Sequence, residues 1–395
     1  YKNLDHLDSL KVQPKKFKSH SESGKYLSAN YSILNGDVFN ANKILKSGEN
    51  NLTLLELQFF SNLISGNFEI AHNISNSLIL KNKKNFLYKI PQFAVSFKNK
   101  DFENSLKIAK ENKKFFGFNK IISLLEFWLK HLKLKSKEDL MIYNGSNFEL
   151  PVYKLLVLEN FYNIKELKKI ADYNNNLKSL SNIDLLSLAG FYFRSGDFES
   201  FEKIIKYKLS NKFDRDYIFK NFSSPNNLFN KKLNFQTILS SYLYNIALQA
   251  NNKNENSSSY IKILLEMSLY ICPDMDAAKY LLNQLYIIQK DINTSYIKSN
   301  LINKKSFFSL PSKLQKLSIF KGLKKSKPYR KLLFELYNKF PDNEIILFEL
   351  ANFYKSNNNY NDALNVYKKI IKIEDKNNHL LFLYAICLDK LGGWE

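Results

Sequence analysis

The amino-acid sequence predicts an all-α protein, an α-solenoid in which antiparallel helix pairs stack on one another. Three observations lead to this fold class. Glycine and proline are scarce, with 11 and 8 in 395 residues, whereas sandwiches and barrels need many turn residues of these types. Apolar residues recur at helical spacing between short polar runs. The same short turn pattern also returns along the chain, which indicates a repeat protein.

Three segments differ in how regular this pattern is. Residues 1–21 are polar and lysine-rich with little periodicity, so they are predicted to be a flexible lead-in. Residues 22–241 are predicted to form degenerate helical repeats, and residues 242–395 better-matched repeats of which the last is truncated. Hydrophobic residues make up 45% of the chain, which is ample for a core.

The recurring turn pattern has the chemistry of a helical hairpin. A Gly, Asn or Lys can take the left-handed conformation that ends the first helix, and a following Asp or Asn can cap the second helix. An aromatic residue then fits between the two helices, and a small residue lets them approach. The pattern reads NGDVFNA at 35–41, SGNFEIA at 65–71, NKDFENS at 99–105, SGDFESF at 195–201, NNNYNDA at 357–363 and LGGWE at 391–395.

The pattern has a fixed period in the C-terminal part. Asn358 and Gly392, in successive turns, are separated by one period of about 34 residues. Pro273 and Pro341 both follow an expected helix, and two such periods separate them. Repeats of this length therefore begin at Asp276, Leu310, Glu344 and Asn378.

This period and its anchor residues resemble the tetratricopeptide repeat (TPR) family. The resemblance implies a right-handed superhelix of about ten helix pairs. The order of the elements is also similar to that of large TPR proteins of alphaproteobacteria, and the break in the last repeat predicts that the chain is a fragment of a longer array. The anchors are Leu347, Leu350, Ala351, Tyr354, Tyr360, Ala363, Tyr367 and Ile370 in one repeat, and Leu381, Tyr384, Ala385, Leu388, Gly392 and Trp394 in the next.

The charge allows two interpretations. The formal net charge is +22, from 59 basic and 37 acidic residues, and such an excess is typical of proteins that bind nucleic acid or anionic surfaces. Only Arg194, Arg215 and Arg330 are arginines, however, and the arginine fork is the better ligand for phosphates and base edges. The favoured explanation of the positive charge is therefore the codon bias of an A/T-rich bacterial genome, which places many lysines on the protein surface. Nucleic acid is the disfavoured partner.

The sequence predicts no catalysis. Cys272 and Cys387 stand alone, and none of the five histidines has a second ligand at metal-binding spacing. His131 is expected to be a partly exposed helical residue. Nucleotide-binding loops and the nucleophile elbow are absent from the sequence, so neither an enzyme nor a cofactor is expected.

The TPR resemblance implies a binding surface on the first helix of each pair. Family ligands contact the second, fifth, ninth, twelfth and thirteenth repeat positions, and the fifth position is aromatic in three repeats. TPR domains that bind the C-terminal carboxylate of a peptide have Lys at the fifth position. This chain has aromatic residues at that position, so an apolar peptide or a partner helix is expected instead. The alternative, that these rings pack against the neighbouring repeat, is equally open. The predicted contact residues are Tyr280, Gln284, Ile345, Phe348, Asn352, Lys355 and Phe382.

The function predicted from these features is a non-catalytic bacterial scaffold that binds a protein or peptide partner. The alternatives are a lysine-rich solenoid that binds RNA or an acidic envelope polymer, and the repeat region of a larger enzyme. No apolar run is long enough to span a bilayer. The chain starts at Tyr1, so a preceding segment is expected, and bacterial cytoplasm and periplasm both remain open.

Overall fold

The structure is a computed structural model. It describes residues 21–34, 37–45, 51–81, 85–113, 117–133, 151–165, 167, 181–208, 232–253, 258–289, 291–304, 306–373 and 378–392. The predicted lead-in therefore lies, apart from Ser21, outside the described residues. Two compact units divide the chain: unit 1 comprises 1–149 and 235–273, and unit 2 comprises 150–234 and 274–395. The predicted boundary at 241/242 separates the degenerate repeats from the better-matched ones. It falls within the helix Phe235–Lys253.

The described residues form nineteen α-helices and no strand, which confirms the all-α prediction. In unit 1, consecutive helices pack as antiparallel pairs. Its elements are α1 (Glu22–Leu34), α2 (Val38–Leu45), α3 (Leu52–Ile64), α4 (Phe68–Leu80), the short 3₁₀ helix η2 (Phe86–Tyr88), α5 (Lys89–Lys98), α6 (Phe102–Glu111), α7 (Phe118–Lys133), α13 (Phe235–Lys253) and α14 (Ser258–Ile271).

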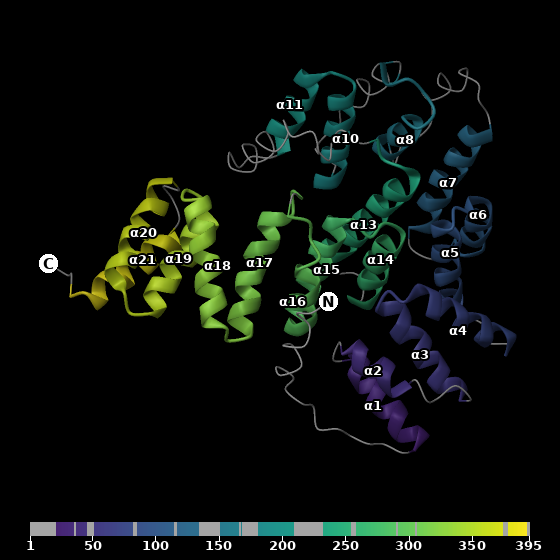
Figure 1. Cartoon of the computed structure of the whole chain (residues 1–395), viewed down its shortest axis with the longest axis horizontal. Coiled ribbons are helices and arrows are strands. Elements are labelled where there is room, and N and C mark those ends of the chain that lie inside the picture. Colours follow the sequence, from purple (N-terminus) through teal and green to yellow (C-terminus); the bar gives the residue numbers. More distant parts are fainter. Residues whose placement is uncertain are drawn as a thin grey trace. The chain divides into compact units, whose positions relative to one another are not determined.

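Unit 2 has the same pairing, and its helices α16 to α21 follow one another in a row (Figure 1). Each helix from α16 to α20 packs on the one before it and on the one after it, and α21 packs on α20. Such nearest-neighbour packing defines a solenoid. The elements are α8 (Pro151–Leu158), α10 (Asn182–Arg194), α11 (Phe198–Lys208), α15 (Asp276–Ile288), α16 (Ile292–Ser299), α17 (Ser309–Gly322), α18 (Ser326–Lys339), α19 (Glu344–Ser356), α20 (Tyr360–Ile373) and α21 (Asn378–Lys390).

The hairpin turns share one backbone conformation. Gly66, Lys100, Gly196, Lys324, Asn358 and Gly392 all have positive φ values, from 53° to 80°. These are the left-handed residues of Schellman-type helix ends, in which the next amide bonds back to a carbonyl five residues earlier. At seven turns that bond measures 2.8–3.0 Å, and its donors are Asp37, Asn67, Asp101, Asp197, Asp291, Lys325 and Asn359.

The turns of the C-terminal repeats follow the predicted register. One repeat period separates Lys324 from Asn358, and the same period separates Asn358 from Gly392. The turn at Lys324 was not predicted, because no aromatic residue directly follows it. Several turns also contain the predicted cap: the Asp101 carboxylate accepts from the Asn104 amide at 3.2 Å.

We expect Lys100→Gly to raise the free energy of unfolding by about 1 kcal/mol. The left-handed conformation strains a residue with a Cβ atom and leaves glycine unstrained. The matched control is Lys107→Gly, at an exposed position inside α6, where glycine should lower the free energy of unfolding by about 1 kcal/mol. Urea denaturation compares the two variants with the natural chain, and equal losses would contradict the turn geometry.

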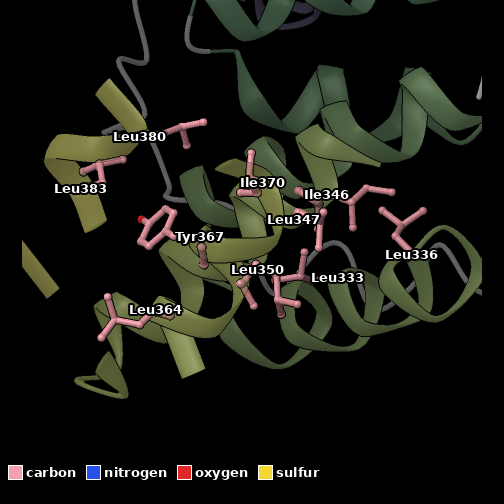
Figure 2. Close-up of a cluster of buried hydrophobic side chains, with 14 of the residues drawn as sticks. Leu333, Leu336, Ile346, Leu347, Leu350, Leu364, Tyr367, Ile370, Leu380 and Leu383 are labelled. Carbon is pink, nitrogen blue, oxygen red and sulfur yellow. The ribbon is translucent and has the colours of Figure 1, made fainter. Parts of the chain in front are cut away.

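The core of the C-terminal repeats is continuous from α17 to α21. Figure 2 shows side chains of α18, α19, α20 and α21 that lie within it. Ala351 and Ala363 are fully buried at the crossing of α19 and α20, which is where the sequence predicted small residues. In the repeat that begins at Leu310, the large residues Leu317 and Tyr329 are buried instead.

Unit 1 departs from nearest-neighbour packing, because α14 packs on α3 and α5. Phe235 at the start of α13 stacks on Trp128 of α7, with ring centroids 4.2 Å apart. The Gln236 side chain donates to the Lys98 carbonyl at 3.0 Å, across 138 residues of sequence. A contact of this range belongs to no repeat period, and the sequence did not predict it.

Candidate functional site

The predicted contact residues lie on α15, α19 and α21 of unit 2. These three helices are the first helices of their repeats, and the fold therefore places all seven residues on the helices that the sequence predicted. Their surroundings differ, and they form three groups: polar side chains that bond within the protein, apolar side chains that are exposed, and one lysine beside a buried thiol.

The polar residues are engaged inside the protein. Gln284 donates from Nε2 to the Tyr280 hydroxyl at 3.2 Å, and the Tyr280 ring lies 5.6 Å from that of Phe308. Burial raises the pKa of Tyr280 above its usual value. Asn352 accepts from the Tyr367 hydroxyl at 3.0 Å. The Gln284–Tyr280 bond lies within α15, whereas the Asn352–Tyr367 bond joins α19 to α20.

A buried polar network supports the first of these pairs. Asn283 donates to the Gln315 amide oxygen at 2.8 Å and accepts from the Ser295 hydroxyl at 2.6 Å. Gln315 in turn donates to the Tyr280 carbonyl at 3.3 Å. The network joins α15, α16 and α17, and because its members satisfy one another it fixes their packing.

The apolar residues are the accessible part of the predicted surface. Ile345 on α19 is 57% exposed and Phe382 on α21 is 62% exposed. Phe348 is half-buried, packs on the core below α19, and its ring centroid lies 6.3 Å from that of His379 on α21. The Phe348 ring therefore meets the neighbouring repeat and still has accessible area, so both sequence interpretations apply to it in part.

Lys355 lies half-buried on α19 and acts on α21 by its charge. Burial raises the pKa of the Cys387 thiol, and the positive charge of Lys355 opposes this shift. Cys387 is a fully buried core residue, and this role is the ordinary one for a lone cysteine.

The anchor predicted at Leu381 is not buried, since 48% of it is exposed. The buried residues of α21 are Leu380, Leu383 and Cys387, which face α20. The equivalent of Leu381 one repeat earlier is Leu347, which is buried in the core that α19 and α20 share. In the described part of the chain, no helix covers the corresponding face of α21.

His131 was expected to be partly exposed, and this expectation was wrong. Its side chain is buried in the last turn of α7, with Nδ1 2.8 Å from the Phe127 carbonyl oxygen. The ring also packs on the Phe127 ring of the preceding turn, with centroids 4.3 Å apart. His6 and His20 lie outside the described residues. Among those described, no group of three or more His, Cys, Asp or Glu could hold a metal ion.

The sequence did not predict a cavity on α18. An open hollow of ≈ 320 Å³ is lined by Lys327, Arg330, Lys331 and Phe334. The run KKSKPYRK at 324–331 was the available signal, but it falls on the second helix of its repeat, away from the surface that the TPR resemblance implies.

Comparison with known proteins gives a resemblance of fold. No protein-family model matches the sequence, and the search of curated proteins found no match. Among solved structures, the chain resembles yeast Tom70, with 13% identity, a TM-score of 0.32 and coverage of 93% of this chain and 80% of that chain. It also resembles the APC/C hetero-tetramer Cut9–Hcn1, with 15% identity, a TM-score of 0.36 and coverage of 94% and 78%.

At TM-scores of 0.32 and 0.36 these resemblances carry no argument about this chain. The TPR-like fold of this chain rests on its own features: paired helices, left-handed turn residues and a fixed repeat register. No described helix has the length and apolar character needed to cross a membrane.

Proposed function

We propose that this chain is a non-catalytic scaffold that binds a protein or peptide partner on the first helices of its C-terminal repeats. The observation that supports this proposal is the exposure of Ile345 and Phe382 on α19 and α21, on the helices where the TPR resemblance implies a ligand. Exposed apolar side chains at regular repeat positions suit the apolar face of a partner helix or an extended peptide. The proposal includes a bacterial source for the protein and the seven contact residues predicted from the sequence.

The apolar residues should form the centre of the contact with the partner, and the polar residues should lie at the edges of the interface. Phe348 and Phe382 supply aromatic area, which dominates the energy of most protein interfaces. Tyr280, Gln284 and Asn352 already have bonds within the protein, and they therefore contribute shape more than new hydrogen bonds.

The test has two stages. A photoreactive phenylalanine analogue at position 382 first captures the partner in the source cells, and the captured protein is then purified and titrated against the intact chain. We expect Phe382→Asp to weaken this binding about tenfold or more, with little change in stability because Phe382 is mostly exposed. The matched control is Ile297→Asp, an exposed apolar position on the second helix α16. Equal losses in both variants would contradict a specific surface.

We expect Phe348→Ala to weaken the same binding more than it lowers stability. The ring keeps accessible area on α19 although it packs on the core, so its removal takes away contact with the partner and only part of a core residue. Titration of the partner and thermal unfolding are measured on the same sample. A large loss of stability with unchanged affinity would make Phe348 a structural residue.

The salt dependence of binding separates this proposal from the polyanion alternative. RNA binding that collapses between low and moderate salt, with Phe382→Asp having no effect, would favour the alternative. Capture of one protein that tolerates salt favours the scaffold.

A further inference from the structure

The cavity on α18 lies on one face of that helix. Lys327, Arg330, Lys331 and Phe334 are spaced by three, one and three residues, so their side chains lie together along the helix surface. The opposite face of α18 is the core face, with Tyr329, Leu333 and Leu336 buried. The hollow, of ≈ 320 Å³, is open to solvent, and its lining residues all come from this one helix.

The positive charge of this cavity is not neutralised by the described residues around it. Lys327, Arg330 and Lys331 are exposed, and none of them forms an ion pair with a described carboxylate. The nearby carboxylates have other partners: Glu335 pairs with Lys313 at 2.9 Å, and Glu349 pairs with Lys321 at 2.6 Å. Residues 313–339 contain nine basic residues and one acidic residue, so the excess charge is concentrated on α17, α18 and the turn between them.

Arg330 contacts an aromatic ring one helical turn away. Its guanidinium lies 5.7 Å from the centroid of the Phe334 ring, within the range of a cation–π contact. The contact favours one placement of the guanidinium, whose fork of N–H donors matches a carboxylate with two parallel hydrogen bonds.

The Phe334 ring is not a platform for a nucleic-acid base. Its neighbours are Phe353 and Tyr354, which approach it edge to face at 5.9 and 6.3 Å, and Arg330 lies over it. Proteins that bind single-stranded nucleic acid need accessible aromatic faces on which successive bases stack. The fork of Arg330 fits carboxylates and phosphates alike, so the lack of an accessible face for base stacking is the observation that favours an acidic peptide over single-stranded RNA here.

We propose that the cavity on α18 binds an acidic peptide segment, with Arg330 holding one carboxylate through two hydrogen bonds and Lys327 and Lys331 attracting its neighbours. The inference deepens the proposed function, since the acidic segment belongs to the protein partner of the scaffold. The partner would then have a second contact region on α18, the second helix of its repeat. The first contact region contains Ile345 and Phe382, on the first helices of their repeats.

The test is fluorescence anisotropy with the intact chain and a labelled peptide of ten glutamates. The triple variant Lys327→Gln/Arg330→Gln/Lys331→Gln should weaken binding about tenfold at moderate salt. The matched control, Lys368→Gln/Lys372→Gln/Lys390→Gln, removes the same charge from exposed positions on α20 and α21, and it should change affinity less than about twofold. Arg330→Lys keeps the charge and loses the fork, and it should fall between the two.

Two results would overturn the inference. Equal losses in the triple variant and its control would show that net charge alone attracts the peptide. A labelled RNA of ten nucleotides that binds more tightly than the peptide, and that is lost with the same triple variant, would assign the cavity to nucleic acid. The capture experiment at position 382 does not depend on the peptide-binding experiment. Failure of the peptide test leaves the scaffold proposal in place, and failure of the capture experiment leaves the peptide result for the α18 cavity unaffected.

Discussion

Replacing Arg194 by methionine is expected to destabilise the packing of α8 on α10 by about 3–5 kcal/mol. The Arg194 guanidinium donates from Nε to Glu159 Oε1 at 2.6 Å and from Nη2 to Oε2 at 2.7 Å. Glu159 is only 4% exposed, and it directly follows α8, while Arg194 is the last residue of α10. Without its partner, the carboxylate is a buried charge with no second fork to hold it.

The neighbouring Lys232 does not replace the lost arginine. Burial lowers the pKa of Lys232, the charge of Glu159 opposes this shift, and the charge of Arg194 adds to it. Its ammonium group is a point charge and cannot form the two parallel hydrogen bonds of the guanidinium. Arg194→Lys should therefore lose part of the stability that Arg194→Met loses.

The double variant Glu159→Leu/Arg194→Met is the control for this prediction. Replacing both members of a buried pair by apolar residues of similar size is often neutral, so the double variant should lie close to the natural chain. Hydrogen exchange of the α8 and α10 amides reports the local free energy of opening. A loss below about 1 kcal/mol in Arg194→Met would show that the pair is open to water.

The sequence predicts those parts of this fold that depend on neighbouring residues. The left-handed residues Lys100 and Asn358 were found because a helix end needs a residue that tolerates positive φ, followed by a cap. Ala351 and Ala363 were found because two helices that cross closely need small residues, and both are fully buried. Each of these requirements lies within one repeat unit, and the sequence period therefore reveals it.

Contacts between distant segments have no such period. The Trp128–Phe235 stack and the packing of α14 on α3 and α5 follow from how the helices of unit 1 assemble, and no local pattern encodes them. The same reason limits how much of the candidate site can be predicted from the sequence. The helices that hold Tyr280, Phe348 and Phe382 were predictable, but the bond from Gln284 to the Tyr280 hydroxyl depends on side-chain positions that repeat spacing does not determine.

The crossing of α19 and α20 gives the second large expected effect. Ala363 is fully buried in the first turn of α20 and belongs to the same core cluster as Ala351 of α19. Ala363→Trp should destabilise the packing of α19, α20 and α21 by about 3 kcal/mol or more, because the indole has no space unless the two helices separate. Asn365→Trp, at an exposed position two residues along α20, introduces the same side chain and should change stability by about 0.5 kcal/mol or less.

Hydrogen exchange and thermal unfolding of the two tryptophan variants distinguish the outcomes. In a repeat array each unit is stabilised by its neighbours, so the loss at Ala363 should also speed exchange in α21, whose buried Leu380 and Leu383 pack in the same cluster. Exchange that rises in α20 alone would mean that the C-terminal helices do not share one core. An unchanged unfolding curve for Ala363→Trp would move this residue out of the helix crossing and would invalidate the repeat register on which the proposed binding surface depends.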